Sequence, residues 1–232
     1  MAIAADDDLD AILSGKEQMP WVEIRLGVGQ TAIPDSYPTK VVFYPGEPVG
    51  APGIDEWQLD RTMDSDRGLA FSYGIVAANL RPFGLVGGVE MVYVEQSLDL
   101  ASSVSNGDVQ DVPDDAAGIR YQTFGGNALL GVGYALGTNA HVELLGVLGA
   151  GAADIGIHSG DMHHQVSSSG WYWNYGLRGG LYYRFGKFVL GGFVEYMHVD
   201  VDVSQGWADA YTYTDTDASG VGYRIELGYH IQ

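Results

Sequence analysis

Apolar and polar residues alternate with a period of two along almost the whole chain from Trp21 onward. This is the pattern of β-strands whose two faces meet different surroundings. In the clearest segment, 171–185, one set of alternate positions is mostly aromatic or aliphatic, while the other mixes Gly, Asn, Arg and Tyr. The last segment repeats the alternation. We predict eight strands, at 21–30, 69–80, 83–96, 119–136, 139–152, 170–185, 187–201 and 220–232.

The connections between these strands alternate in length. Three are tight turns, at 79–82, 136–139 and 185–187. The others are long and rich in Asp, Gly, Ser and Pro, at 31–68, 97–118, 153–169 and 202–219. Antiparallel strands with short turns at one end and long loops at the other form an up-and-down barrel. The sequence therefore predicts an all-β fold, an eight-stranded antiparallel barrel over 21–232, with 1–20 as a tail or a short amphipathic helix.

A period of two does not say which face points into the barrel. In a soluble barrel the polar face is outside and normally carries lysine, but this chain has only three lysines. Its polar positions instead combine Gly, Ser and Asn with single Arg and Glu residues, which suits a narrow interior. This favours the inverted arrangement, a transmembrane barrel with its apolar face toward lipid.

The aromatic residues of the apolar face support the same arrangement, because they gather near the strand ends. A membrane barrel places such residues in two girdles at the lipid–water interfaces, with aliphatic side chains between them. The predicted girdle residues are Trp171, Trp173, Tyr183, Phe185, Phe188, Tyr196, Tyr223 and Tyr229.

The charges are divided between loops and strands. The chain has 30 acidic and 11 basic residues and a net charge of −19. The four long loops hold 18 of the acidic residues and 3 of the basic ones, whereas the strands and tight turns carry no net charge. A neutral wall with acidic loops suits insertion into a lipid bilayer. Because a chain this acidic lacks the basic surface that binds nucleic acid, we expect no nucleic-acid partner.

The inverted facing turns several charged side chains into the lumen, where they require partners. Arg178 and Glu195 are almost equally far from the 185–187 turn and should be neighbours. Arg224 and Glu226 should lie near Arg25 and Glu23 if the first and last strands close the barrel. The predicted network is Glu23, Arg25, Glu90, Glu143, Arg178, Glu195, Arg224 and Glu226. Its excess of Glu over Arg must be offset by water, Tyr hydroxyls or a protonated Glu.

Together with the final Val-Gly-Tyr-Arg-Ile-Glu-Leu-Gly-Tyr-His-Ile-Gln segment, this architecture resembles the small outer-membrane barrels of Gram-negative bacteria, the OmpA/OmpX/OmpW group. The resemblance implies a bacterial outer-membrane location and an interior filled by side chains. Function would then lie in the acidic loops. We expect a non-enzymatic structural or interaction protein that contacts the lipid bilayer, other outer-membrane proteins or divalent cations.

Two other functions stay open. OmpW-like barrels suggest by resemblance a narrow channel for small or apolar solutes. A lipid-modifying enzyme is a weaker alternative, for which His198 lies near the loop end of its strand, and the Ser-rich segment 153–169 holds further histidines. No nucleophile, base and orienting acid can be recognised from spacing alone.

Cofactor and metal chemistry has little support. The chain has no Cys, which excludes thiol catalysis and Cys-based metal sites, and we expect no cofactor. Asp161, His163 and His164 form a weak candidate site for a transition metal. The loop acids could hold calcium, although none has the EF-hand spacing. These clusters are Asp111, Asp114 and Asp115, and Asp209, Asp215 and Asp217.

Overall fold

The computed structural model forms strands where the alternation predicts them, and eight long strands build one sheet. The structure describes residues 21–32, 41–43, 57–59, 63–65, 68–100, 102–105, 108–111, 117–159, 162–202, 211–213, 216–217 and 219–231. The eight long strands are β1 (Trp21–Ala32), β5 (Gly68–Arg81), β6 (Phe83–Leu100), β9 (Ala117–Leu136), β10 (Ala140–Ser159), β11 (Met162–Phe185), β12 (Phe188–Asp202) and β15 (Gly220–Ile231).

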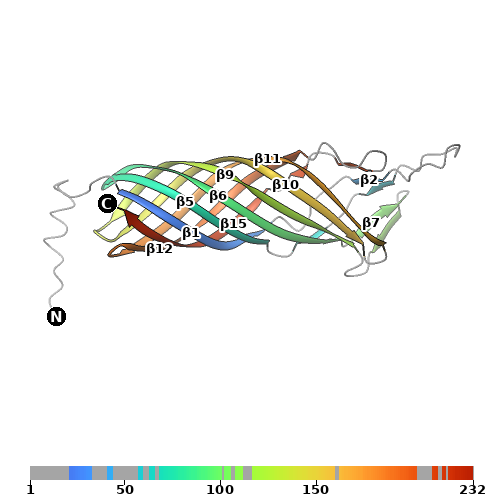
Figure 1. Cartoon of the computed structure of the whole chain (residues 1–232), viewed down its shortest axis with the longest axis horizontal. Helices are drawn as coiled ribbons and strands as arrows, with labels where there is room; N and C mark the ends of the chain where they lie inside the picture. The colour runs from blue at the N-terminus through green and yellow to red at the C-terminus, as the bar shows by residue number, and fades with distance from the viewer. Residues whose placement is uncertain are drawn as a thin grey trace.

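These strands close into an antiparallel barrel (Figure 1). Each pairs with its neighbour along the chain, β11 pairs with β12, and the first and last long strands, β1 and β15, close the ring. Closure gives every long strand two partners and removes the open edges that would otherwise leave backbone groups unpaired in lipid. The predicted fold is confirmed, and the C-terminus lies at the end of the barrel away from β2 and β7 (Figure 1).

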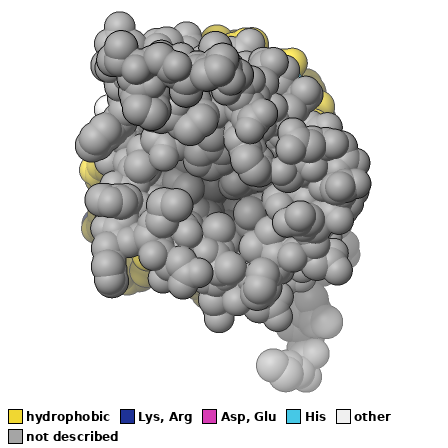
Figure 2. Space-filling view, turned by 90° about the vertical axis from the view of Figure 1, so that its right-hand side faces the viewer, with side chains coloured by type: hydrophobic (Ala, Val, Ile, Leu, Met, Phe, Trp, Pro, Cys, Tyr) yellow, Lys and Arg dark blue, Asp and Glu magenta, His cyan; other side chains and the backbone are white. Residues whose placement is uncertain are grey.

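The apolar face of the sheet points outward. Along β5 and β15, exposed apolar or aromatic residues alternate with buried ones, so the pleat separates the two sets completely. Leu130, for example, is 70 % exposed, whereas Glu90 is 5 % exposed. In the view onto the loop end, hydrophobic side chains show around the outer edge (Figure 2). An exterior of aliphatic side chains around a polar interior is the arrangement of a membrane barrel.

Within the described parts of the chain, no helix is long and apolar enough to cross a membrane.

The three short connections lie at the same end of the barrel as the C-terminus. Phe185 pairs with Phe188, so Gly186 and Lys187 alone make that turn, and Gly186 has a φ of 63°. Gly137 has a φ of 84° in the turn between β9 and β10. Side-chain-bearing residues rarely adopt this conformation, which explains glycine at both positions.

At the loop end, the structure departs from the prediction first in 153–169. We expected 153–169 to be a long loop, but β10 and β11 continue as a paired ladder through Ile157 and Val166. The β-branched residues Ile155, Ile157 and Val166 explain the extension, because they favour a pleated ladder even where Ser and Gly surround them. Residues 1–20, predicted as a tail or helix, lie outside the described residues.

Short strands also occur within the other three predicted loops. β2 (Val41–Phe43) pairs with β3 (Trp57–Leu59) and β13 (Tyr211–Tyr213) in a sheet separate from the barrel. A second separate pair is β7 (Ser102–Ser105) with β8 (Asp108–Asp111). β4 (Met63–Ser65) pairs with β6, and β14 (Thr216–Asp217) pairs with β12, so both extend the barrel wall.

The facing can be tested with two outward leucines of the same strand. Leu130 lies between the aromatic residues Phe124 and Tyr134 of β9, whereas Leu136 lies at the turn. Leu130→Arg should lower the free energy of unfolding in lipid vesicles by about 2–4 kcal/mol, and the control Leu136→Arg by about 0–1 kcal/mol. Denaturant titration of the vesicle-bound protein measures both. Equal effects of the two variants would contradict a lipid-facing position for Leu130.

Candidate functional site in the barrel lumen

The eight charged residues predicted for the lumen all lie inside the barrel. Their side chains come from six different strands and are only 2–5 % exposed. Because charges in such surroundings are costly unless paired and hydrogen-bonded, their partners determine what the lumen can do. The structure gathers them into two connected clusters, centred on Arg25 and on Arg178.

The first cluster joins opposite walls of the barrel. Arg25 of β1 donates two hydrogen bonds to the carboxylate of Glu143 on β10, with N–O distances of 2.7 and 2.9 Å. In the ring of eight strands, β1 and β10 are four positions apart, so this paired bond crosses the full lumen. The same guanidinium donates to Glu23 at 2.8 Å and lies 3.9 Å from Glu226. A two-point Arg–carboxylate contact is among the stronger charge-assisted hydrogen bonds.

The second cluster lies nearer the loop end. Arg178 of β11 donates to Glu195 on the adjacent strand at 2.8 Å and to Glu90 on β6 at 2.9 Å. Arg224 of β15 donates to the other oxygen of Glu195 at 2.7 Å. Asn127 donates to Glu90 at 2.8 Å. Since β6 and β11 are three positions apart in the ring, this cluster also spans the lumen.

The strand register explains where the predicted neighbours meet. Arg178 and Glu195 are direct cross-strand partners, as their distances from the turn indicate. Glu226 lies opposite Gly27 and approaches Arg25. Arg224 does not lie beside Arg25 and Glu23 as expected. It is opposite Gly29, two steps nearer the loop end, and this places its guanidinium in the second cluster.

The excess of glutamate is offset in part by side chains outside the eight residues predicted for the network. Tyr182 donates its hydroxyl hydrogen to Glu226 at 2.8 Å, and its ring lies 3.8 Å from the Arg25 guanidinium. His141 Nε2 is 2.9 Å from Glu143, and His230 Nδ1 is 3.7 Å from Glu23. All three residues occupy inward-facing positions in the period-two alternation of their strands. That alternation in the sequence could therefore have identified them as lumen residues.

A cavity of about 70 Å³ lies on the loop side of the second cluster. Its wall combines aliphatic and aromatic side chains with amides and the Arg224 guanidinium. The side-chain oxygens of Asn127 and Asn174 are buried there without a protein partner. A cavity of this size and polarity has room for a few water molecules, which would satisfy these groups.

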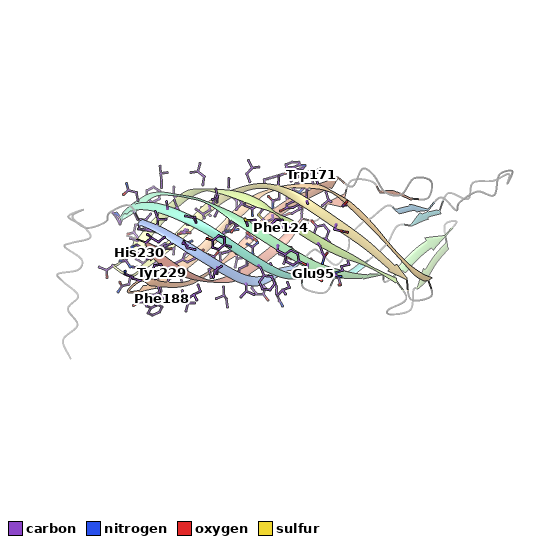
Figure 3. All side chains as sticks on the ribbon, in the orientation of Figure 1. Glu95, Phe124, Trp171, Phe188, Tyr229 and His230 are labelled. Atoms are coloured by element: carbon purple, nitrogen blue, oxygen red, sulfur yellow. The ribbon has the colours of Figure 1, made fainter. Side chains whose placement is uncertain are left out.

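The predicted girdle residues all point away from the lumen and are exposed. Phe188 and Tyr229 are cross-strand partners near the turns, whereas Trp171 lies toward the loop end of the wall, with β11 continuing beyond it to Met162 (Figure 3). Between the two bands the outward positions are aliphatic or Gly, as on β11, where Leu177, Gly179 and Leu181 separate them.

The candidate metal residues gain no support from the described part of the chain. Asp161 lies outside the described residues, and of His163 and His164 only the backbone, in β11, is described. No group of three potential ligands occurs among the described residues. The predicted calcium clusters also involve residues outside this part, or residues whose side chains are not described.

Comparisons with known proteins give similarities of fold alone. No protein-family model matches the chain, and no curated protein sequence matches it significantly. Among solved structures, the attachment invasion locus protein Ail of Yersinia pestis is 14 % identical, with a TM-score of 0.37, covering 92 % of this chain and all of the other. The outer-membrane protease OmpT of Escherichia coli is 10 % identical, with a TM-score of 0.43, covering 94 % of this chain and 100 % of the other. OprG of Pseudomonas aeruginosa is 16 % identical, with a TM-score of 0.40, covering 94 % of this chain and 99 % of the other.

The chain's own geometry defines its class. Eight closed antiparallel strands, an aliphatic outer face between two aromatic bands, and a polar, ion-paired interior describe a transmembrane β-barrel of the bacterial outer-membrane type, surrounded by lipid.

The barrel has both buried and exposed Arg–Glu pairs, and comparing them tests the structural role of the buried ones. Arg25→Met keeps most of the packing of the side chain but leaves three buried carboxylates without their cation, which should cost roughly 3–5 kcal/mol of unfolding free energy. The control is Arg120→Met, because Arg120 and its partner Glu95 are 55 % and 36 % exposed. It should cost about 0–1 kcal/mol. Denaturant titration in vesicles compares them, and similar losses would contradict the structural role of Arg25.

Proposed function

We propose that the protein is a closed outer-membrane barrel, without enzymatic activity in its lumen, that acts through its surface as a structural or interaction component. The observation that carries the proposal is the paired bond from Arg25 to Glu143 across the barrel. Together with the Arg178 cluster beside it, this bond places buried ion pairs across the barrel axis. Solute passage would leave charges unpaired in the narrow interior, which is unfavourable.

The acidic loops are the surface through which we infer that it acts. They hold most of the excess negative charge of the chain, at the end of the barrel remote from the turns. Clustered acids raise the local concentration of cations and of basic surfaces and speed their encounter. A basic segment of another outer-membrane component, or divalent cations, would fit this surface.

A second candidate function is a narrow channel, and the cavity on the loop side favours it. Its mixture of aliphatic walls and unpartnered amide oxygens would accommodate a small solute. The Arg178 cluster forms the floor of this cavity, so passage would require that floor to open.

Conductance distinguishes these two functions. In planar bilayers the wild-type protein should be silent at all voltages, because the cross-lumen bonds block the axis. Removing the cross-lumen bonds of both clusters, with Arg25→Ala, Glu143→Ala, Arg178→Ala and Glu90→Ala together, should produce ion conductance. The control is the exposed pair, Arg120→Ala with Glu95→Ala, which should stay silent. Steady conductance of the wild type would refute the closed barrel and favour the channel.

The loop proposal is tested by the salt dependence of cation binding. The protein in vesicles of neutral lipid should bind a polylysine peptide, and binding should weaken strongly between low and physiological ionic strength because screening reduces the attraction. Replacing Asp111, Asp114 and Asp115 with Asn should weaken binding further. Fluorescence anisotropy measures the affinity. Equal binding by this variant and the wild type would rule out that cluster as a contact.

A further inference from the structure

Three polar side chains meet on the outward face of the barrel at the loop end of β12. Tyr196 pairs with Val221 and Met197 with Gly220, so one further step of the ladder places Ser219 opposite His198. Asp200 lies two residues beyond His198 and therefore on the same face of the strand. None of the three belongs to the lumen network.

Ser219 and His198 are within hydrogen-bond distance, and Asp200 lies at ion-pair distance from the same imidazole, an arrangement that can supply a nucleophile, a base and an orienting acid. Ser219 Oγ lies 2.6 Å from His198 Nδ1, and His198 Nε2 lies 3.5 Å from Asp200 Oδ1. The carboxylate favours a proton on Nε2, which leaves Nδ1 as the acceptor of the serine hydroxyl hydrogen. An imidazole in this state can remove the serine proton as the hydroxyl attacks a carbonyl. His198 and Asp200 are 30 % and 36 % exposed, so a substrate can reach them.

The surroundings of His198 indicate which substrate can reach it. The ring centroids of Tyr175 and Trp173 lie 4.8 and 6.4 Å from that of His198, and both side chains point outward. They belong to the aromatic band at the loop end, which Trp171 marks in Figure 3. Aromatic bands lie at the lipid headgroup level, next to the boundary with the acyl chains. In a bilayer, ester carbonyl groups lie at this boundary.

We propose that Ser219, His198 and Asp200 form a hydrolytic site that cleaves an O-acyl ester of a lipid in the leaflet at the loop end. Ser219 Oγ attacks the ester carbonyl carbon while its proton passes to His198 Nδ1. The bond to the alcohol oxygen then breaks, and His198 returns the proton to that oxygen. Water, activated by His198, hydrolyses the acyl-serine to a free fatty acid and restores Ser219. Asp200 is a positioning residue that holds the imidazole ring.

This activity goes beyond the proposed function and does not depend on a closed lumen. It also departs from the expectation of a protein without catalysis. From the sequence alone, no nucleophile for His198 can be recognised. The register of β12 with β15, continued by one step, and the contact of Ser219 Oγ with His198 Nδ1 identify Ser219 as the hydroxyl beside it.

The experiment uses the full chain reconstituted in two kinds of vesicle, one of phospholipid alone and one that also contains lipopolysaccharide. Mass spectrometry follows free fatty acid and the deacylated lipid, and the vesicle in which they form identifies the ester. Ser219→Ala and His198→Gln should each lower the rate by on the order of 10³-fold or more. Ser97→Ala, an exposed serine elsewhere in the wall, should keep the wild-type rate.

Asp200 requires a readout that a purely structural role would not change. Asp200→Asn should lower the rate less than Ser219→Ala does, since an orienting acid contributes less than a nucleophile. Asp200→Glu should restore part of the rate because it restores the carboxylate. Gel migration without boiling checks that every variant still folds.

Covalent labelling of the wild-type protein tests the nucleophile without any substitution. A fluorophosphonate probe should modify Ser219, as peptide mass spectrometry would show. The proposal is overturned if neither lipid is cleaved, if cleavage survives Ser219→Ala in a folded protein, or if the probe leaves Ser219 unmodified.

Discussion

The structure depends on one constraint: a barrel with its apolar face toward lipid must turn its polar face into a lumen too narrow to hydrate it. Every charge placed there needs a partner within reach. With eight strands, the opposite wall is close enough for long side chains to meet, and Arg25 reaches Glu143 from it. The short diameter of the barrel makes the ion pairs necessary and also brings their partners within reach. Paired side chains therefore occupy the interior.

Small residues make room for these large side chains. Tyr182 lies opposite Gly191, and a Cβ at that position would collide with the Tyr182 ring. The ring therefore lies over the glycine, between the barrel wall and the Arg25 guanidinium, and also donates to Glu226. An aromatic ring that covers a cross-strand glycine fills the space left by the missing side chain. The period-two alternation of Gly with bulky polar residues is thus a packing requirement of the lumen.

The strands, the facing and the local pairing of Arg178 with Glu195 follow from the sequence, because each depends on counting residues from a turn or on a period of two. Contacts between non-neighbouring strands do not follow in this way. They depend on the stagger between strands, which sets the height at which each side chain enters the lumen. Arg25 with Glu143 is such a contact, and so is Arg178 with Glu90. The extension of β10 and β11 does not follow from the sequence, because the Ser and Gly of 153–169 are typical of loops, although Ile and Val accompany them.

The ion-paired interior and the proposed loop-end site are connected through the rigidity of the wall. Arg178 and Glu195 link β11 with β12, and Arg224 links β15 with Glu195, so these three strands are fastened together from the inside. On their outer face, β11 supplies Trp173 and Tyr175, β12 supplies His198 and Asp200, and Ser219 precedes β15. A hydrolytic constellation needs its groups held within a fraction of an ångström of their working positions. The buried ion pairs supply that rigidity a few residues away, so the same bonds that cross the lumen would hold the outer site in place.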